Sequence, residues 1–339
     1  MEKAIVAESV MEPAEALVGL PAPVPAPSAG GAIPAVHGEG LDALAQRWIQ
    51  YLDVSPKTAE VYAGAIHGFL RWLKERGIVS PGRADVLAYR DWLKQEHAPA
   101  TVSLYMTAVR LLFSWAEQEG IAADVARRVK GSRIDRGHKR DSLTSAQASR
   151  LLESVDRSSL QGLRDYAVLA LMLTTGLRTI SVVRANVEDI GTAGDAAILR
   201  YQGKGHDERS EFVKLAPQTD AAIRAYLAAR GPAKPAEPLF AVVSNRHIGG
   251  RMTTRALSGM VKARLATAGF SSPRLTAHSL RHTAATLSLL TGGTVEETQR
   301  LLGHADISTT MVYVHQLDRA ASKLEEQIAG AIFGKAEGA

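Results

Sequence analysis

Apolar residues recur every three or four positions through residues 41–120, and this spacing restricts the region to amphipathic α-helices. Pro56 marks the start of one helix and Gly77 marks its end. Four amphipathic helices of this size form a small bundle, so we expect a helical domain over residues 41–126. The predicted helices are 41–52, 56–77, 84–96 and 101–120.

Residues 1–40 follow a different pattern, which is incompatible with a packed element. Proline alternates with alanine or valine from Pro21 to Pro27, and Ser28 to Gly31 is rich in small residues, which predicts a flexible, semi-extended tail. The tail carries one lysine and five glutamates, which gives it a net charge of −4. Because the whole chain has a net charge of +5, the remaining residues carry +9. A basic body suggests a polyanionic partner such as nucleic acid, although charge that serves solubility gives the same balance.

A strongly basic segment follows the helical domain. Residues 127–140 contain seven arginines or lysines and one acid. We expect a linker whose bases lie along a phosphate backbone, with a plain charged linker as the alternative. Its candidate DNA contacts are Arg133, Arg136, Lys139 and Arg140.

The remaining chain is predicted to be mainly α with a small antiparallel β-sheet. Strand-like stretches at 196–201 and 210–215 flank a turn at Gly203-Lys204-Gly205, which predicts a hairpin. We place one domain at 141–317 and an amphipathic helix at 318–339, which either packs on its own domain or contacts another protomer. The helices predicted after the hairpin are 217–229, 253–268, 276–290, 294–302, 307–314 and 318–332.

Composition narrows the class of protein. The absence of cysteine excludes disulfides, thiolate metal sites and a cysteine nucleophile. No stretch is long and apolar enough for a membrane span, and the N-terminus does not resemble a signal peptide. We therefore expect a cytoplasmic protein with no membrane contact. Aromatic residues make up only 5% of the chain, so stacking on single-stranded bases is not expected to dominate binding.

Five short segments of the second domain hold basic and hydroxyl side chains in unusual contexts. Two guanidinium groups suit one phosphate, because their forked donors match its non-bridging oxygens and stabilise a pentavalent transition state. A tyrosine hydroxyl can act as a covalent nucleophile if a histidine accepts its proton, and a lysine can protonate the leaving oxygen. This set can perform phosphoryl transfer without a metal or other cofactor. The candidate catalytic residues are Arg178, Lys204, His278, Arg281, His304 and Tyr313.

These segments, in this order, resemble the tyrosine recombinase (phage integrase) family over about residues 41–330. The matching motifs are Thr-Gly-Leu-Arg178, Lys204 between glycines, His278-x-x-Arg281, Leu-Gly-His304 and Tyr313. The resemblance implies that Arg178 and Arg281 bind the scissile phosphate and Lys204 acts as general acid. It also implies that His278 assists proton removal from Tyr313, that His304 donates to the phosphate, and that Tyr313 forms a 3′-phosphotyrosyl link.

The resemblance further implies a C-shaped clamp on double-stranded DNA, formed by the helical core-binding domain and the catalytic domain. Expected partners are short inverted core sites, a homotetramer that passes through a Holliday junction, and an accessory or directionality protein. The expected location is then the nucleoid. A mobile-element integrase is the first interpretation, with an Xer-type dimer resolvase, a type IB topoisomerase and a non-catalytic DNA-binding regulator as alternatives.

Further contacts to DNA are expected from exposed bases of both domains, although a solvated charged face has the same pattern. The candidates are Lys57, Arg71, Lys74, Arg110, Arg251, Arg255 and Lys262.

One position departs from the family pattern. The family has glutamate three residues after Arg178, whereas this chain has Ser181. We expect either that Glu188 or Asp189 substitutes for that carboxylate or that the site is weakened. His278 and His282 have a spacing that suits zinc, but no third ligand is evident, so His282 is interpreted as a packed residue behind the site.

Overall fold

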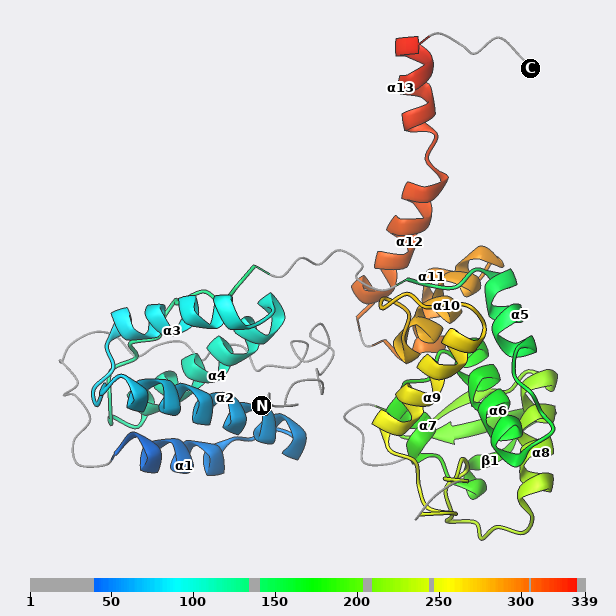
Figure 1. Cartoon of the computed structure of the whole chain (residues 1–339), viewed down its shortest axis with the longest axis horizontal. Coiled ribbons are helices and arrows are strands. Elements are labelled where there is room, and N and C mark those ends of the chain that lie inside the picture. The colour runs from blue at the N-terminus through cyan, green and yellow to red at the C-terminus, as the bar shows by residue number, and fades with distance from the viewer. Residues whose placement is uncertain (1–39, 134–140, 204–208, 244–246, 305, 334–339) are drawn as a thin grey trace. The chain divides into compact units, whose positions relative to one another are not determined.

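The computed structural model describes residues 40–133, 141–203, 209–243, 247–304 and 306–333. The chain divides into two compact units, one ending at Gly137 and the other beginning at His138. The predicted fold class is confirmed, because both units are mainly helical and the second contains a small antiparallel sheet (Figure 1). None of the described helices is both long and apolar enough to cross a bilayer.

The first unit contains four helices, close to the predicted ranges. Its core is rich in aromatic side chains, including Trp48, Phe69 and Tyr89, which are almost completely buried. Pro56 occupies the first turn of the second helix, and the Ser55 side chain accepts a hydrogen bond from the Thr58 amide. The helices are α1 (Leu41–Tyr51), α2 (Pro56–Glu75), α3 (Arg83–Glu96) and α4 (Pro99–Gln118).

The first half of the predicted linker packs on this unit. Val129 is buried in the helical core, and its carbonyl accepts a hydrogen bond of 2.9 Å from Nη1 of Arg110 on α4. The Ser103 hydroxyl donates to the Ser132 carbonyl at 2.9 Å. The prediction of a linker over all of 127–140 was therefore wrong for 127–133, because one apolar side chain and two backbone carbonyls attach that part to α4. Residues 134–140 lie outside the described residues.

The second unit is built around α6 (Leu160–Thr175). This helix contacts α5 (Ser145–Glu153), α8 (Pro217–Arg230), α9 (Thr254–Thr267) and α10 (Ala277–Leu290) (Figure 1). Helix α6 is apolar without interruption from Tyr166 to Leu173 and is buried along most of its length. Gly176 ends the helix in a left-handed conformation, with φ of +65°. The other helices are α5 (Ser145–Glu153), α7 (Thr179–Arg184), the 3-10 turn Val187–Asp189, α8 (Pro217–Arg230), α9 (Thr254–Thr267), α10 (Ala277–Leu290), α11 (Val295–Leu302), α12 (Ser308–Ala321) and α13 (Leu324–Phe333).

The sheet contains the predicted hairpin and one further strand. The strands β1 (Ile190–Ala193), β2 (Ala196–Tyr201) and β3 (Glu211–Lys214) are antiparallel neighbours in that order. Strand β1 was not predicted from the sequence, because its four residues include glycine and show no two-residue alternation of apolar and polar side chains. The register of β2 and β3 places Tyr201 opposite Glu211.

The C-terminal helices have different boundaries from those predicted. The expected break between 307–314 and 318–332 is absent, and α12 continues to Ala321, so Tyr313 lies inside a longer helix. The chain leaves the helix at Ser322, which is extended and whose hydroxyl accepts a hydrogen bond from the Leu324 amide. This local cap, rather than a proline or glycine, separates α12 from α13.

Candidate active site

Gly176 brings three helices together at the end of α6. A Cβ atom at this position would lie 2.5 Å from a methyl group of Leu302 and 3.3 Å from Cβ of Ala284. Only glycine fits both this close approach and the positive φ. The Gly176 carbonyl accepts a hydrogen bond of 2.8 Å from Nη1 of Arg281, so the same turn orients a guanidinium group.

Arg281 lies on α10 and is 3% exposed. Its Nη2 atom donates to the Leu302 carbonyl at 2.7 Å, at the end of α11. Two carbonyls from different elements therefore hold the guanidinium plane. Arg178 is half-buried at the N-cap of α7, two residues beyond Gly176, so the α6–α7 turn and α10 supply the two expected phosphate-binding arginines.

Tyr313 lies on α12 with its side chain 4% exposed. Its hydroxyl is 2.5 Å from Nδ1 of His282, and the His282 and His278 rings meet edge to face with centroids 4.4 Å apart. The family resemblance implied that His278 assists proton removal from Tyr313, and His282 was interpreted as a packed residue behind the site. The two histidines are one helical turn apart on one face of α10, so the sequence did not indicate which ring reaches the hydroxyl.

His304 follows Gly303, which ends α11 with a φ of +60°. Its Nδ1 atom lies 2.9 Å from the Thr310 hydroxyl, and its carbonyl accepts a hydrogen bond from the Gln299 side chain. The ring is 8% exposed and is fixed beside the first turn of α12. Of the six predicted catalytic residues, only Lys204 lies outside the described residues.

Ser181 is buried, and its hydroxyl donates to the Gln202 carbonyl at 3.3 Å. The two acids expected to compensate have other partners. Asp189 accepts from the Asn186 amide at 2.6 Å and from Nη1 of Arg209 at 2.9 Å, and Glu188 accepts from the Asn186 side chain at 3.1 Å. These contacts stabilise the turn before β1, so the structure gives no support to either substitution.

The candidate DNA contacts fall into two groups. Arg110 donates to the Val129 carbonyl, and Arg251 donates to the carbonyls of Val183 and Ala185, so both guanidinium groups hold backbone within their own units. These two stay predicted DNA contacts, although Arg110 is half-buried and both guanidinium groups already bind backbone carbonyls. The side chains of Lys57, Arg71, Lys74, Arg133, Arg255 and Lys262 are exposed, whereas Arg136, Lys139 and Arg140 lie outside the described residues.

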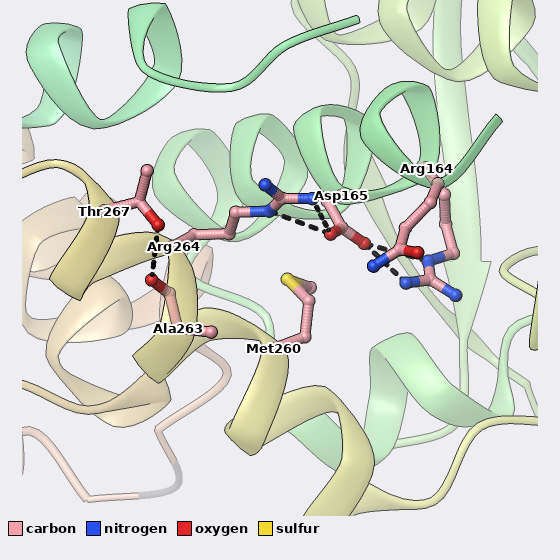
Figure 2. Close-up of a pocket in the computed structure, with 7 residues that line it drawn as sticks. Arg164, Asp165, Met260, Ala263, Arg264 and Thr267 are labelled. Carbon is pink, nitrogen blue, oxygen red and sulfur yellow. Dashed lines mark hydrogen bonds and ion pairs between the residues drawn. The ribbon is translucent and has the colours of Figure 1, made fainter. Parts of the chain in front are cut away.

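A pocket of about 220 Å³ lies between α6 and α9, beside a carboxylate shared by two arginines (Figure 2). Asp165 accepts from Nη2 of Arg164 and from Nη2 of Arg264, each at 2.6 Å. Arg164 also donates to the Ala241 carbonyl at 3.2 Å. These charged groups join α6 to α9 and to residue 241, which is a structural role. The described residues contain no cluster of three side chains suited to a metal ion.

Models of known protein families match residues in both units. The model described as "Phage integrase family" matches residues 141–319, and the model described as "Phage integrase, N-terminal SAM-like domain" matches residues 43–122. The chain belongs to the phage integrase family. Members of this family are tyrosine recombinases, and the chain is therefore a DNA strand-transferring enzyme.

Curated relatives support this assignment. The chain is 32% identical to tyrosine recombinase XerD of Lacticaseibacillus casei over 79% of this chain and 92% of the relative. It is 31% identical to tyrosine recombinase XerC of Herpetosiphon aurantiacus, over 83% and 93% respectively.

Two solved structures show the same fold at low sequence identity. A XerH recombinase bound to a palindromic difH substrate aligns with a TM-score of 0.64 at 20% identity, over 84% of this chain and 85% of that one. A lambda integrase tetramer bound to a Holliday junction aligns with a TM-score of 0.63 at 17% identity, over 82% and 78%.

Proposed function

We propose that this chain is a site-specific recombinase that cleaves and rejoins duplex DNA through a 3′-phosphotyrosyl intermediate formed by Tyr313. The observation that carries the proposal is the buried Tyr313 hydroxyl, which is hydrogen-bonded to His282 next to the anchored guanidinium of Arg281. A buried tyrosine beside a proton acceptor and a phosphate-binding group has the parts that nucleophilic attack on phosphorus requires.

In the proposed cleavage step, the Tyr313 oxygen forms a bond to phosphorus and the bond from phosphorus to the 5′ oxygen breaks. The tyrosine proton passes to Nδ1 of His282, and Lys204 gives a proton to the departing 5′ oxygen. Arg178 and Arg281 hold the non-bridging oxygens, and His304 donates a further hydrogen bond. The covalent link retains the energy of the phosphodiester, so rejoining by a second 5′ hydroxyl needs no nucleotide cofactor.

Covalent capture tests this proposal. The full chain is incubated in EDTA with nicked duplexes of randomised sequence, and protein-linked DNA is denatured, isolated and sequenced beside the Tyr313→Phe variant. We expect a 3′-linked adduct with a sequence preference that is absent from the variant. An adduct without preference supports the topoisomerase alternative, and DNA retention without an adduct supports the regulator.

The two histidines are distinguished by the same assay. His282→Asn removes the group in contact with the tyrosine hydroxyl, so the rate of adduct formation should fall by about 10²-fold or more. His278→Asn should cause the smaller loss. A larger loss of rate in His278→Asn than in His282→Asn would identify His278 as the proton acceptor.

The proposed assembly is a homotetramer on two duplexes with short inverted sites. Support comes from α13, where Leu324, Ile328 and Ile332 expose apolar surface, and from the fold shared with a lambda integrase solved as a tetramer on a Holliday junction. Deletion of residues 322–339 leaves α12 intact and should abolish synapsis while single-site binding persists. Synapsis by the truncated chain, measured by native gel, would contradict this role.

For the biological role, the XerC and XerD relatives favour the resolvase interpretation over a mobile-element integrase. Mapping the captured sequence onto the host genome tests this choice. A single inverted site in the chromosome is expected for resolution, whereas sites at the ends of a mobile element are expected for integration.

A further inference from the structure

The β2–β3 hairpin places an acid, Glu211, beside the backbone that precedes His304. Tyr201 and Glu211 are directly paired across the two strands. A Cβ atom added to Gly303 would lie 3.3 Å from the Tyr201 hydroxyl and 3.5 Å from Oε2 of Glu211. Both polar groups therefore converge on the backbone immediately before His304.

The same backbone is attached to Arg281. The Leu302 carbonyl, one peptide unit before Gly303, accepts the 2.7 Å hydrogen bond from Nη2 of Arg281. Burial and a hydrogen bond to Glu211 raise the pKa of the Tyr201 hydroxyl, while the charges of Arg178 and Arg281 act on it in the opposite direction. Tyr201 thus lies within the field of both arginines, stays protonated, and donates to the Glu211 carboxylate.

Guanidinium groups that are wholly or partly buried need a nearby negative charge when no phosphate is bound. Glu188 and Asp189 interact with Asn186 and Arg209 instead. We propose that Glu211, tethered by Tyr201, is the positioning residue that holds Arg178 and Arg281 in register for the scissile phosphate. The inference rests on the proposed function for its effect on cleavage, but its effect on the arginines can be measured without DNA.

The variants are Glu211→Gln, Glu211→Asp and Tyr201→Phe in the full chain. Glu211→Gln keeps an acceptor for Tyr201 and removes only the charge, whereas Tyr201→Phe keeps the charge and removes the tether. Glu237→Gln is the matched control, because Glu237 pairs with Arg230 at 2.7 Å in a different part of the unit.

The first measurement is the rate of covalent adduct formation on the duplex recovered by capture. We expect Glu211→Gln and Tyr201→Phe to lower this rate by about tenfold or more, with DNA retention and Tm close to those of the unaltered chain. Glu211→Asp should recover part of the rate, and Glu237→Gln should not change it. A loss of rate explained by a lower Tm would overturn the proposal.

The second measurement is phenylglyoxal modification of arginines, mapped by mass spectrometry on the protein alone. Modification of Arg281 and Arg178 should rise severalfold in Glu211→Gln, while Arg264, which is paired with Asp165, serves as the internal reference. Unchanged reactivity of both arginines overturns the proposal, even if cleavage is slower. If the unaltered chain forms no adduct at all, the proposed function fails, and this second measurement still decides the role of Glu211.

Discussion

The two units bury different kinds of side chain. In the described part of the first unit, Thr107 is the one buried polar or charged residue, and the core consists of aliphatic and aromatic groups. The second unit buries many polar groups in addition to its apolar core. They are Arg164, Asp165, Thr175, Ser181, Asn186, Asp189, Thr219, Ser279, Arg281, His282, Thr283, Thr298, His304 and Thr310.

This difference fits a first unit that presents a surface and a second unit that performs chemistry. Burying a polar group is costly unless hydrogen bonds replace those lost to water, so each such group must be held in one arrangement. Arg281 and His282 satisfy this condition through Gly176, Leu302 and Tyr313. The function of the first unit is therefore expected at its exposed lysines and arginines, and the function of the second unit at its buried polar side chains.

The largest expected effect is on the cleavage rate, and it should distinguish two arginines that both donate to backbone carbonyls. Arg281→Lys loses the forked donor of the second unit, and the cleavage rate should fall by about 10²- to 10³-fold. Arg110→Lys loses a similar fork onto the Val129 carbonyl in the first unit, and should cost about 1 kcal/mol of stability while cleavage persists. The rate of adduct formation measures cleavage in both variants, and urea unfolding measures their stability. Equal losses of cleavage would mean that Arg110 also serves the DNA.

Two glycines with nearly the same backbone conformation give the next comparison. Gly77 has a φ of +67° and Gly176 a φ of +65°, so replacement by alanine strains both by about 1–2 kcal/mol. Only Gly176 has a close neighbour, at 2.5 Å, so Gly176→Ala should lose a further 1–3 kcal/mol or so through overpacking.

Unfolding of the two units can be followed separately. All four tryptophans lie in the first unit, so their fluorescence reports on that unit, while circular dichroism follows both. Gly77→Ala should shift the fluorescence transition, and Gly176→Ala should shift only the remaining dichroism. An equal loss of stability at the two glycines would show that Leu302 and Ala284 shift to accommodate the added methyl group at residue 176.

A smaller effect is expected on the exposed surface of the first unit. Arg71→Gln and Lys74→Gln each remove one expected phosphate contact, so each should reduce the slope of log K against log salt by about one. Lys94→Gln is the control, because its ammonium group already pairs with Asp91 at 2.9 Å. A slope that does not change in any variant would remove α2 from the DNA surface.

The smallest effect concerns two buried tyrosines. The Tyr89 hydroxyl has no hydrogen-bond partner among the described residues, and burial raises its pKa. Tyr89→Phe should therefore leave stability unchanged or raise it by up to about 1 kcal/mol. Tyr201→Phe removes a hydrogen bond and should not be stabilising. Destabilisation by Tyr89→Phe, measured by fluorescence in urea, would show that the Tyr89 hydroxyl makes a stabilising contact.

The sequence predicted the elements whose signals are local. Helical periodicity located α1–α4, and the Gly203-Lys204-Gly205 turn located β2 and β3. It failed where tertiary contacts decide the outcome. The segment 127–133 has the charge of a linker, but Val129 fits the apolar core and Arg110 binds the adjoining backbone.

The candidate site shows the same division. Motifs brought Arg178, Arg281, His304 and Tyr313 to attention, because their residue types suit phosphoryl transfer. The choice between His278 and His282 depends on how α12 packs across α10, which no short motif encodes. The position of Glu211 depends on the strand register that places it opposite Tyr201.

The uninterrupted course of α12 has a mechanical consequence. Tyr313 and Ala321 belong to one rigid rod, and at a rise of about 1.5 Å per residue they are separated by roughly 12 Å along its axis. The exposed apolar face of α13 joins this rod through the extended Ser322. In the proposed homotetramer, a contact that a second protomer makes with α13 is therefore connected to Tyr313 along α12, without contact to the DNA or the arginines.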